Sequence, residues 1–149
     1  GVGAIPVEVT EVQAPLVFWH KEYLSDSGGA GRWRGGLAQR IEIAARDGAA
    51  FECSAATFDR RANPARGRLG GAAGAAGRVE IEAADGQCTV HEGKGTLRIP
   101  AGGRLRVDLP GGGGFGPPGM RDPAQSLQDL SCGLIGPQTN PIPVADKSP

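Results

Sequence analysis

The stretch RVEIEAADGQCTV, residues 78–90, decides the fold class. Its valine and isoleucine alternate with glutamates, a spacing that places apolar and charged side chains on opposite faces of a β-strand. The pair Asp85-Gly86 follows, and because glycine accepts the positive φ of a tight turn, this pair predicts a hairpin. The alternation resumes after the turn, so the stretch predicts two paired antiparallel strands.

The same period-two spacing recurs along most of the chain. A second pair, Asp47-Gly48, lies between two such segments and predicts another hairpin. We therefore expect an all-β fold of about eight short strands with glycine-rich turns, forming a sandwich or a barrel. This domain is expected to span residues 1–135. The other predicted strands lie at residues 5–10, 16–24, 37–43, 51–55, 97–99 and 105–109.

One short helix is expected near the carboxyl end. Asp122 can cap it, and Pro123 suits the first helical position because the missing N–H would be unpaired there. Gly133 is a fitting terminator. Three leucines would line the side of the helix that packs on the sheet, namely Leu127, Leu130 and Leu134. Residues 136–149 are rich in proline and should form an extended tail.

Charge and composition exclude several classes of function. The 16 basic and 16 acidic side chains give a net charge of zero, which argues against binding to nucleic acid or to an anionic membrane. No apolar run is long enough for a membrane span, and because no basic segment followed by an apolar stretch opens the chain, we expect no signal peptide. Three cysteines without paired spacing indicate free thiols, as in a cytoplasmic protein.

Two segments are similar to known chemical motifs but lack the surrounding features that those motifs require. The segment Asp26-Ser27-Gly28-Gly29 is similar to the nucleophile segment of chymotrypsin-like proteases, but that fold needs two barrels and a distant histidine, whereas His20 is close by. The spacing Gly111-x-Gly113-x-x-Gly116 matches a dinucleotide fingerprint, yet prolines follow where a phosphate-binding helix should begin. Both segments are better explained as glycine-rich turns.

Two further motifs also lack their partners. Lys94 stands between glycines, but neither the glycine spacing nor the next residue fits a phosphate-binding loop. Cys88 and His91 have a spacing that a metal could use, yet no second pair of ligands accompanies them. We expect no catalytic residue and no metal ligand in this chain.

The corner Asp59-Arg60-Arg61 can present a planar cationic fork to a carboxylate or phosphate. An internal ion pair, with Asp59 orienting one of the arginines, explains the same residues equally well. Trp33, between two arginines, could likewise stack on a partner or anchor a glycine-rich loop on the core.

Taken in order, five motifs resemble the carboxyl-terminal region of the hydantoinase B/oxoprolinase family. The resemblance covers about residues 4–134. The motifs lie at residues 26–36, at the Asp59-Arg60-Arg61 corner, and at residues 70–74, 109–118 and 121–123.

The resemblance implies a role within a large subunit that works with a hydantoinase A-type ATP-binding subunit. Such assemblies open cyclic amides with ATP hydrolysis, and related ones carboxylate ketones. ATP and a divalent metal would then serve the full assembly, with no cofactor in this chain and no activity of the chain alone. Alternatively, the chain is a non-catalytic β module for binding or assembly.

Within that family, the expected task of this region is scaffolding. Asp59, Arg60 and Arg61 are then the candidates for contact with an anion or a partner. The glycine-rich loops would allow close approach of one backbone to another, at Gly28, Gly29, Gly35, Gly36, Gly111, Gly112, Gly113 and Gly114.

Overall fold

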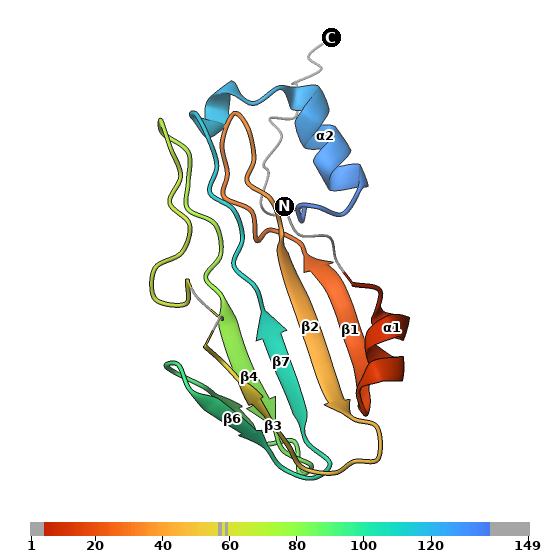
Figure 1. Ribbon diagram of the computed structural model, residues 1–149. Helices are drawn as coiled ribbons and strands as arrows, with labels where there is room; N and C mark the ends of the chain where they lie inside the picture. The colour runs from red at the N-terminus through yellow and green to blue at the C-terminus, as the bar shows by residue number, and fades with distance from the viewer. Residues whose placement is uncertain (1–4, 57, 59, 138–149) are drawn as a thin grey trace.

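The computed structural model describes residues 5–56, 58 and 60–137 (Figure 1). Over these ranges the chain forms seven strands, two α-helices and one 3-10 turn. No helix within them is long and apolar enough to cross a membrane. The elements are α1 (Val7–Gln13), β1 (Leu16–Leu24), β2 (Ala38–Ala45), β3 (Phe51–Ser54), β4 (Arg78–Glu82), β5 (Cys88–Val90), β6 (Thr96–Ile99), β7 (Arg104–Asp108), the 3-10 turn Pro118–Met120 and α2 (Pro123–Ser131).

The strands form two antiparallel sheets, with the order β1-β2-β7-β4-β5 in the larger and β3-β6 in the smaller. Figure 1 shows the smaller sheet lying against one face of the larger sheet near β4. This architecture confirms the fold class predicted from the sequence, β-strands with one helix near the carboxyl end, although the described residues form seven strands rather than about eight and include a second short helix, α1.

The core lies between the two sheets and is built from alternate residues of each strand. Val79 of β4 pairs with Val107 of β7, so both side chains point to the same face. From the smaller sheet, β6 contributes Leu97 and Ile99, each 1% exposed. Burying each such side chain stabilises the fold by about 1.5–3 kcal/mol. The alternation at residues 78–82 thus forms one wall of the core.

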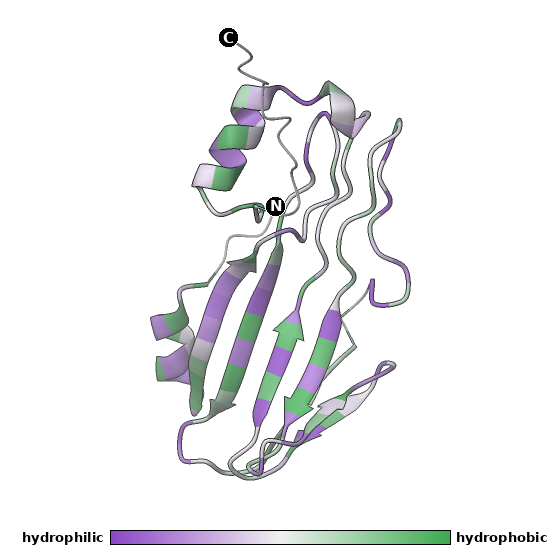
Figure 2. Ribbon diagram, turned by 180° about the vertical axis from the view of Figure 1, so that it is seen from behind, coloured by the Kyte–Doolittle hydropathy of each residue, from purple (hydrophilic) through white to green (hydrophobic). Residues whose placement is uncertain are grey.

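The opposite face of the larger sheet carries paired charges, and Figure 2 shows polar and apolar residues alternating along its strands. Glu42 is only 2% exposed and accepts hydrogen bonds from Arg104 Nη1 and Arg106 Nε, both at 3.0 Å. Arg40 donates to both carboxylate oxygens of Asp108, at 2.7 and 2.8 Å. Burial alone would raise the pKa of Glu42, but the two arginine hydrogen bonds outweigh it and hold the pKa below its ordinary value.

The strand predicted at residues 5–10 is wrong, because helix α1 forms there instead. Short valine and glutamate segments fit both a strand and a helix, and contacts elsewhere decide between them. Here the Glu11 carboxylate accepts the Phe18 N–H at 2.7 Å, which ties the helix to the start of β1. Val12 of the same helix is exposed.

The hairpin predicted at Asp47-Gly48 is also wrong, although Gly48 does adopt a φ of 71°. β2 pairs with β1 and β7, whereas β3 pairs with β6, so this turn carries the chain from one sheet to the other. The hairpin predicted at Asp85-Gly86 is confirmed, because β4 pairs with β5 and Gly86 has a φ of 83°.

Candidate functional site

Three glycine-rich stretches pack together beyond the ends of the strands, and we call residues 27–36, 65–75 and 111–116 the glycine-rich layer. Figure 1 shows them running side by side beyond the upper ends of the strands, with α2 to one side. Backbone hydrogen bonds join them, as where Gly29 N–H donates to Gly112 O at 2.8 Å and Ala72 N–H to Ala30 O at 2.7 Å. Gly112 N–H donates in turn to Gly36 O at 2.8 Å. The layer is therefore held by peptide groups rather than by side chains.

The spacing within this layer excludes side chains at most of the predicted close-approach positions. A Cβ added at Gly35 would lie 2.0 Å from Gly112 O, and one at Gly111 would lie 1.9 Å from Ser27 O. Gly36 differs from its neighbour, because a Cβ there would meet no atom within 4 Å. The other predicted positions would place a Cβ less than 3.0 Å from a backbone atom, namely Gly28, Gly29, Gly112, Gly113 and Gly114.

Ser27 serves the structure of this layer and is not placed as a nucleophile. The side chain is buried, its hydroxyl donates to Leu24 O at 2.5 Å, and its oxygen accepts the Ala38 N–H at 2.7 Å. His20 lies instead near Glu22, with 4.0 Å between Nδ1 and Oε1. Both hydrogen-bonding functions of the hydroxyl are thus occupied by the start of β2 and the end of β1.

Helix α2 has the predicted ends, because Asp122 Oδ1 accepts the Ala124 N–H at 2.9 Å and Gly133 adopts a φ of 69°. The predicted leucine packing is only partly realised. Leu127 is 52% exposed, and the buried residue of the helix is Asp129. The helix therefore docks through a charged residue, which the leucine spacing did not indicate.

Asp129 joins the helix to the glycine-rich layer. Its Oδ2 accepts hydrogen bonds from Arg34 Nε at 3.1 Å and from Arg121 Nη2 at 2.6 Å. Arg121 also donates to Arg32 O at 3.1 Å. A helix period cannot reveal this contact, because Arg34 and Asp129 lie 95 residues apart in the chain.

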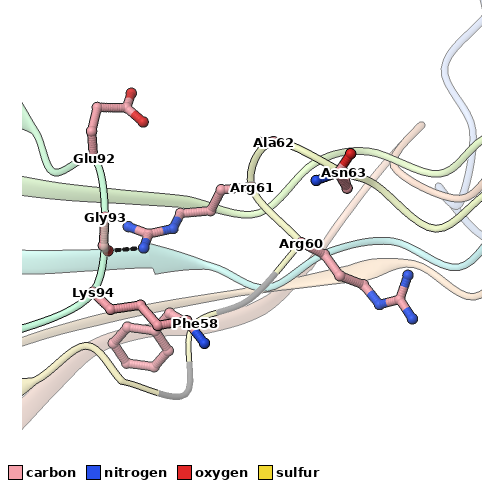
Figure 3. Close-up of a pocket in the computed structure, with 8 residues that line it drawn as sticks. All are labelled: Phe58, Arg60, Arg61, Ala62, Asn63, Glu92, Gly93 and Lys94. Atoms are coloured by element: carbon pink, nitrogen blue, oxygen red, sulfur yellow. Dashed lines mark hydrogen bonds between the residues drawn. The ribbon is translucent and has the colours of Figure 1, made fainter.

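The predicted arginine corner lines a pocket of about 550 Å³ (Figure 3). Arg61 Nη1 donates to His91 O at 2.9 Å, and Arg61 Nη2 donates to Gly93 O. Figure 3 shows the Arg60 side chain pointing away from Arg61. The pocket is lined by Phe58, Arg60, Arg61, Ala62, Asn63, Glu92, Gly93 and Lys94.

The two arginines of this corner therefore do different work. Arg61 fixes the loop at residues 91–93 through carbonyl groups, which orient its charge without neutralising it. Arg60 has a φ of 58°, an uncommon conformation for a residue with a side chain, and that side chain is exposed. Asp59, the third member of the predicted corner, lies outside the described residues. Arg60 is thus the more accessible of the two cations to an anionic group.

The other candidate motifs do not assemble into a metal or dinucleotide site in the described part of the chain. Across the described residues, no three His, Cys, Asp or Glu side chains lie together as a metal site would require. Cys88 is exposed, and His91 Nε2 is buried without a hydrogen-bond partner in the described part of the chain. The cysteines carry free thiols, as the sequence predicts. After residues 111–116 comes the 3-10 turn Pro118–Met120 rather than a phosphate-binding helix.

The model of the hydantoinase B/oxoprolinase family matches residues 1–118, a range that includes the glycine-rich layer. The chain belongs to this family. The resemblance carried by its glycine-rich motifs is thereby confirmed.

Two similar proteins are several times longer than this chain. The chain is 34% identical over 125 residues to the uncharacterized protein MJ0963 of Methanocaldococcus jannaschii. This match covers 84% of this chain and 22% of that protein. It is 31% identical over 138 residues to caprolactamase subunit beta of Pseudomonas jessenii, covering 87% of this chain and 22% of that subunit. The chain thus spans about a fifth of the length of the curated relatives it matches.

Solved structures share the fold. The ATP-dependent caprolactamase of Pseudomonas jessenii superposes with a TM-score of 0.71 at 24% identity, over 88% of this chain and 23% of that one. A nucleotide-free acetone carboxylase superposes with a TM-score of 0.60 at 14% identity, over 90% of this chain and 22% of that one. The architecture described above therefore recurs as one part of larger chains.

Proposed function

We propose that this chain serves as the carboxyl-terminal β domain of a hydantoinase B-type subunit in an ATP-dependent cyclic-amide hydrolase. The observation that carries the proposal is the match to caprolactamase subunit beta, which runs through nearly the whole chain. The match takes up only a small share of that subunit, and this supports a role as one part of a larger catalytic body.

Scaffolding is the task that the geometry supports best. In the glycine-rich layer, no side chain separates Gly35 from Gly112, so the layer has little room to deform. A rigid platform of this kind lowers the entropic cost of holding neighbouring groups in place. At one side of the chain, Arg60 would meet a carboxylate or phosphate of the assembly, next to the loop that Arg61 fixes.

The proposed assembly would use ATP and a divalent metal. The described residues bring together no set of metal ligands. We therefore place metal and nucleotide on other parts of the assembly, with the hydantoinase A-type subunit as the partner for ATP. This chain would support that chemistry by position.

Reconstitution tests the proposal. The chain would be expressed with the remainder of a hydantoinase B-type subunit and its ATP-binding partner, and ring opening of caprolactam, 5-oxoproline and hydantoin would be followed by mass spectrometry. We expect ATP-dependent hydrolysis by the assembly and none by the isolated chain. Hydrolysis by the chain alone, or an assembly inactive on every cyclic amide, would contradict the proposal.

Arg60 supplies a matched pair of variants for the same assay. Arg60→Ala should lower turnover or association, whereas Arg98→Ala should change neither, because Arg98 forms only an exposed ion pair with Glu52 at 2.9 Å. Equal behaviour of the two variants would favour a pure assembly module over a domain that contacts the active site.

Ketone carboxylation is the second candidate, supported by the shared fold of acetone carboxylase. Incorporation of labelled bicarbonate into acetone by the reconstituted assembly, without opening of cyclic amides, would favour it.

A further inference from the structure

Trp33, Phe115 and Arg68 form a row on one face of the glycine-rich layer. Trp33 and Phe115 exchange two backbone hydrogen bonds of 2.9 Å as an antiparallel pair, and Arg68 pairs with Phe115 in the parallel sense. Directly paired residues project to the same side of a sheet. Trp33 is 53% exposed and Phe115 is 48% exposed, so this face is open to solvent.

An apolar residue also projects from the turn next to this row. Gly71 N–H donates to Arg68 O at 2.9 Å, which closes a turn over Leu69 and Gly70. Leu69 is 75% exposed and has a φ of 48°, a conformation that a branched side chain seldom adopts. The fold thus holds a leucine outward at some conformational cost.

Three arginines lie in the stretches that carry these apolar groups, namely Arg32, Arg66 and Arg68. The guanidinium carbon of Arg32 lies 5.7 Å from the centre of the Trp33 ring. Arg32, Arg66 and Arg68 are all exposed, and none forms an ion pair with another described residue. The stretches 27–36, 60–79 and 109–118 contain no Asp or Glu, so the neighbouring sequence offers no internal counter-charge.

The contrast with the arginines of the sheets is informative. Each sheet arginine in the described strands has a carboxylate partner, namely Arg40, Arg78, Arg98, Arg104 and Arg106. Arginine and aromatic side chains on a rigid surface are the residues that carry most binding energy at protein interfaces. Arginines that form no ion pair within the described ranges, beside an open aromatic pair, are therefore suited to bind an acidic partner.

We infer that Arg32, Trp33, Arg68, Leu69 and Phe115, hereafter the arginine-aromatic patch, dock an acidic protein segment that also carries apolar side chains. The segment would belong to the larger remainder of a hydantoinase B-type subunit, an assignment that rests on the proposed function. Charge complementarity sets the chemistry of the segment, and the relatives, several times longer than this chain, supply a body that could carry it. A nucleic acid is the less favoured occupant because the net charge of the chain is zero.

A binding experiment tests the chemistry without reference to activity. In the Trp19→Phe variant, Trp33 is the remaining tryptophan, and its fluorescence would be titrated with a synthetic peptide of alternating glutamate and leucine. We expect a blue shift on binding, and affinity about tenfold weaker for Arg32→Gln/Arg68→Gln, which removes two charges. Arg98→Gln, an exposed arginine of the smaller sheet, should bind as the parent does.

Three outcomes of this titration would overturn the inference. Equally tight binding of a matched peptide of glutamine and leucine would show that charge does not contribute to the affinity. Single-stranded DNA could bind as tightly as the acidic peptide, or neither ligand could shift the Trp33 emission.

Cross-linking in the reconstituted assembly tests the partner. Leu69 would be replaced by benzoylphenylalanine, and the cross-linked peptide would be identified by mass spectrometry. A product with an acidic segment of the remaining hydantoinase B-type subunit supports the inference. A product with the ATP-binding subunit, or no product, overturns it.

The two proposals fail separately in this design. An inactive assembly that still cross-links at position 69 would contradict the proposed function alone. An active assembly without that product would contradict the docking inference alone.

Discussion

Asp129 Oδ2 accepts a hydrogen bond from Arg34 Nε at 3.1 Å, which ties helix α2 to the glycine-rich layer by charge. Arg121 Nη2 donates to the same oxygen at 2.6 Å, so one carboxylate holds two guanidinium groups. Leu127 of the same helix meanwhile remains half exposed. The position of α2 therefore depends on a side chain that a purely apolar account of the helix would overlook.

Asp129→Asn should lower the free energy of unfolding by about 2–3 kcal/mol, because it leaves two part-buried arginines without a carboxylate. Leu127→Ala should cost less than about 0.5 kcal/mol, since the side chain is largely in water. Urea unfolding followed by circular dichroism measures both. A larger loss for Leu127→Ala than for Asp129→Asn would show that the leucines dock the helix after all.

Adjacent glycines provide an internal control for the packing of the glycine-rich layer. Gly35→Ala should destabilise the chain by about 1–3 kcal/mol or more, because its Cβ would overlap Gly112 O. Gly36→Ala should be neutral or stabilise by up to about 1 kcal/mol, since its Cβ meets open space and the unfolded chain loses freedom. Thermal unfolding of the two variants checks the pair, and equal melting temperatures would contradict the close packing.

Glu42 should make the free energy of unfolding depend on pH in the acid range. Its folded pKa lies below the ordinary value, so its contribution is complete above the unfolded pKa near 4.3 and is lost as pH falls through the folded pKa. Glu42→Gln should cost about 3 kcal/mol at neutral pH by leaving Arg104 and Arg106 without their shared carboxylate. The variant should also show a flatter decline of stability in acid.

The matched control for that experiment is Glu52→Gln, which breaks an exposed pair with Arg98. Such a pair contributes about 0–1 kcal/mol, and the acid profile should stay close to that of the parent. Identical pH profiles for the Glu42 variant and the parent would argue against the buried pair.

The three thiols should differ in reactivity. Burial raises the pKa of the Cys53 thiol, whereas Cys88 and Cys132 are exposed. Alkylation by iodoacetamide at neutral pH should therefore be about tenfold slower at Cys53, because the thiolate is the reacting form. Peptide mass spectrometry over a time course gives the three rates. Labelling of Cys53 as fast as that of the other two would contradict its burial.

The alternation of apolar and charged residues was sufficient to predict most of the strands. The alternation around Val79 and Ile81 is a direct consequence of one buried and one charged face, and the structure has both. The strand predicted at residues 5–10 was wrong because a short valine and glutamate segment fits both the period of a strand and the period of a helix. The contact of Glu11 with Phe18, which ties the helix to β1, lies outside that segment. At Asp47-Gly48 the turn chemistry was right, but no turn specifies which strand its neighbour will pair with.

Prediction of the candidate site was limited because its contacts join residues that lie far apart in the sequence. Glycine content indicated close approach, yet only the fold shows that Gly35 faces Gly112 while Gly36 faces open space. The corner at Arg60 and Arg61 was found from residue type, but the carbonyls that orient Arg61 lie 30 and 32 residues further along the chain. Whether Arg60 meets an anion or a partner remains a prediction.

The glycine-rich layer also gives the molecule two ends with different thermal responses. Its contacts bury peptide groups, whereas the space between the sheets buries hydrocarbon. Exposure of hydrocarbon raises the heat capacity on unfolding, and exposure of polar groups lowers it. Hydrophobic stabilisation also weakens on cooling. Near freezing, the core between the two sheets should therefore loosen first. The glycine-rich layer, which is held by hydrogen bonds between peptide groups, should keep its amide protons protected from exchange.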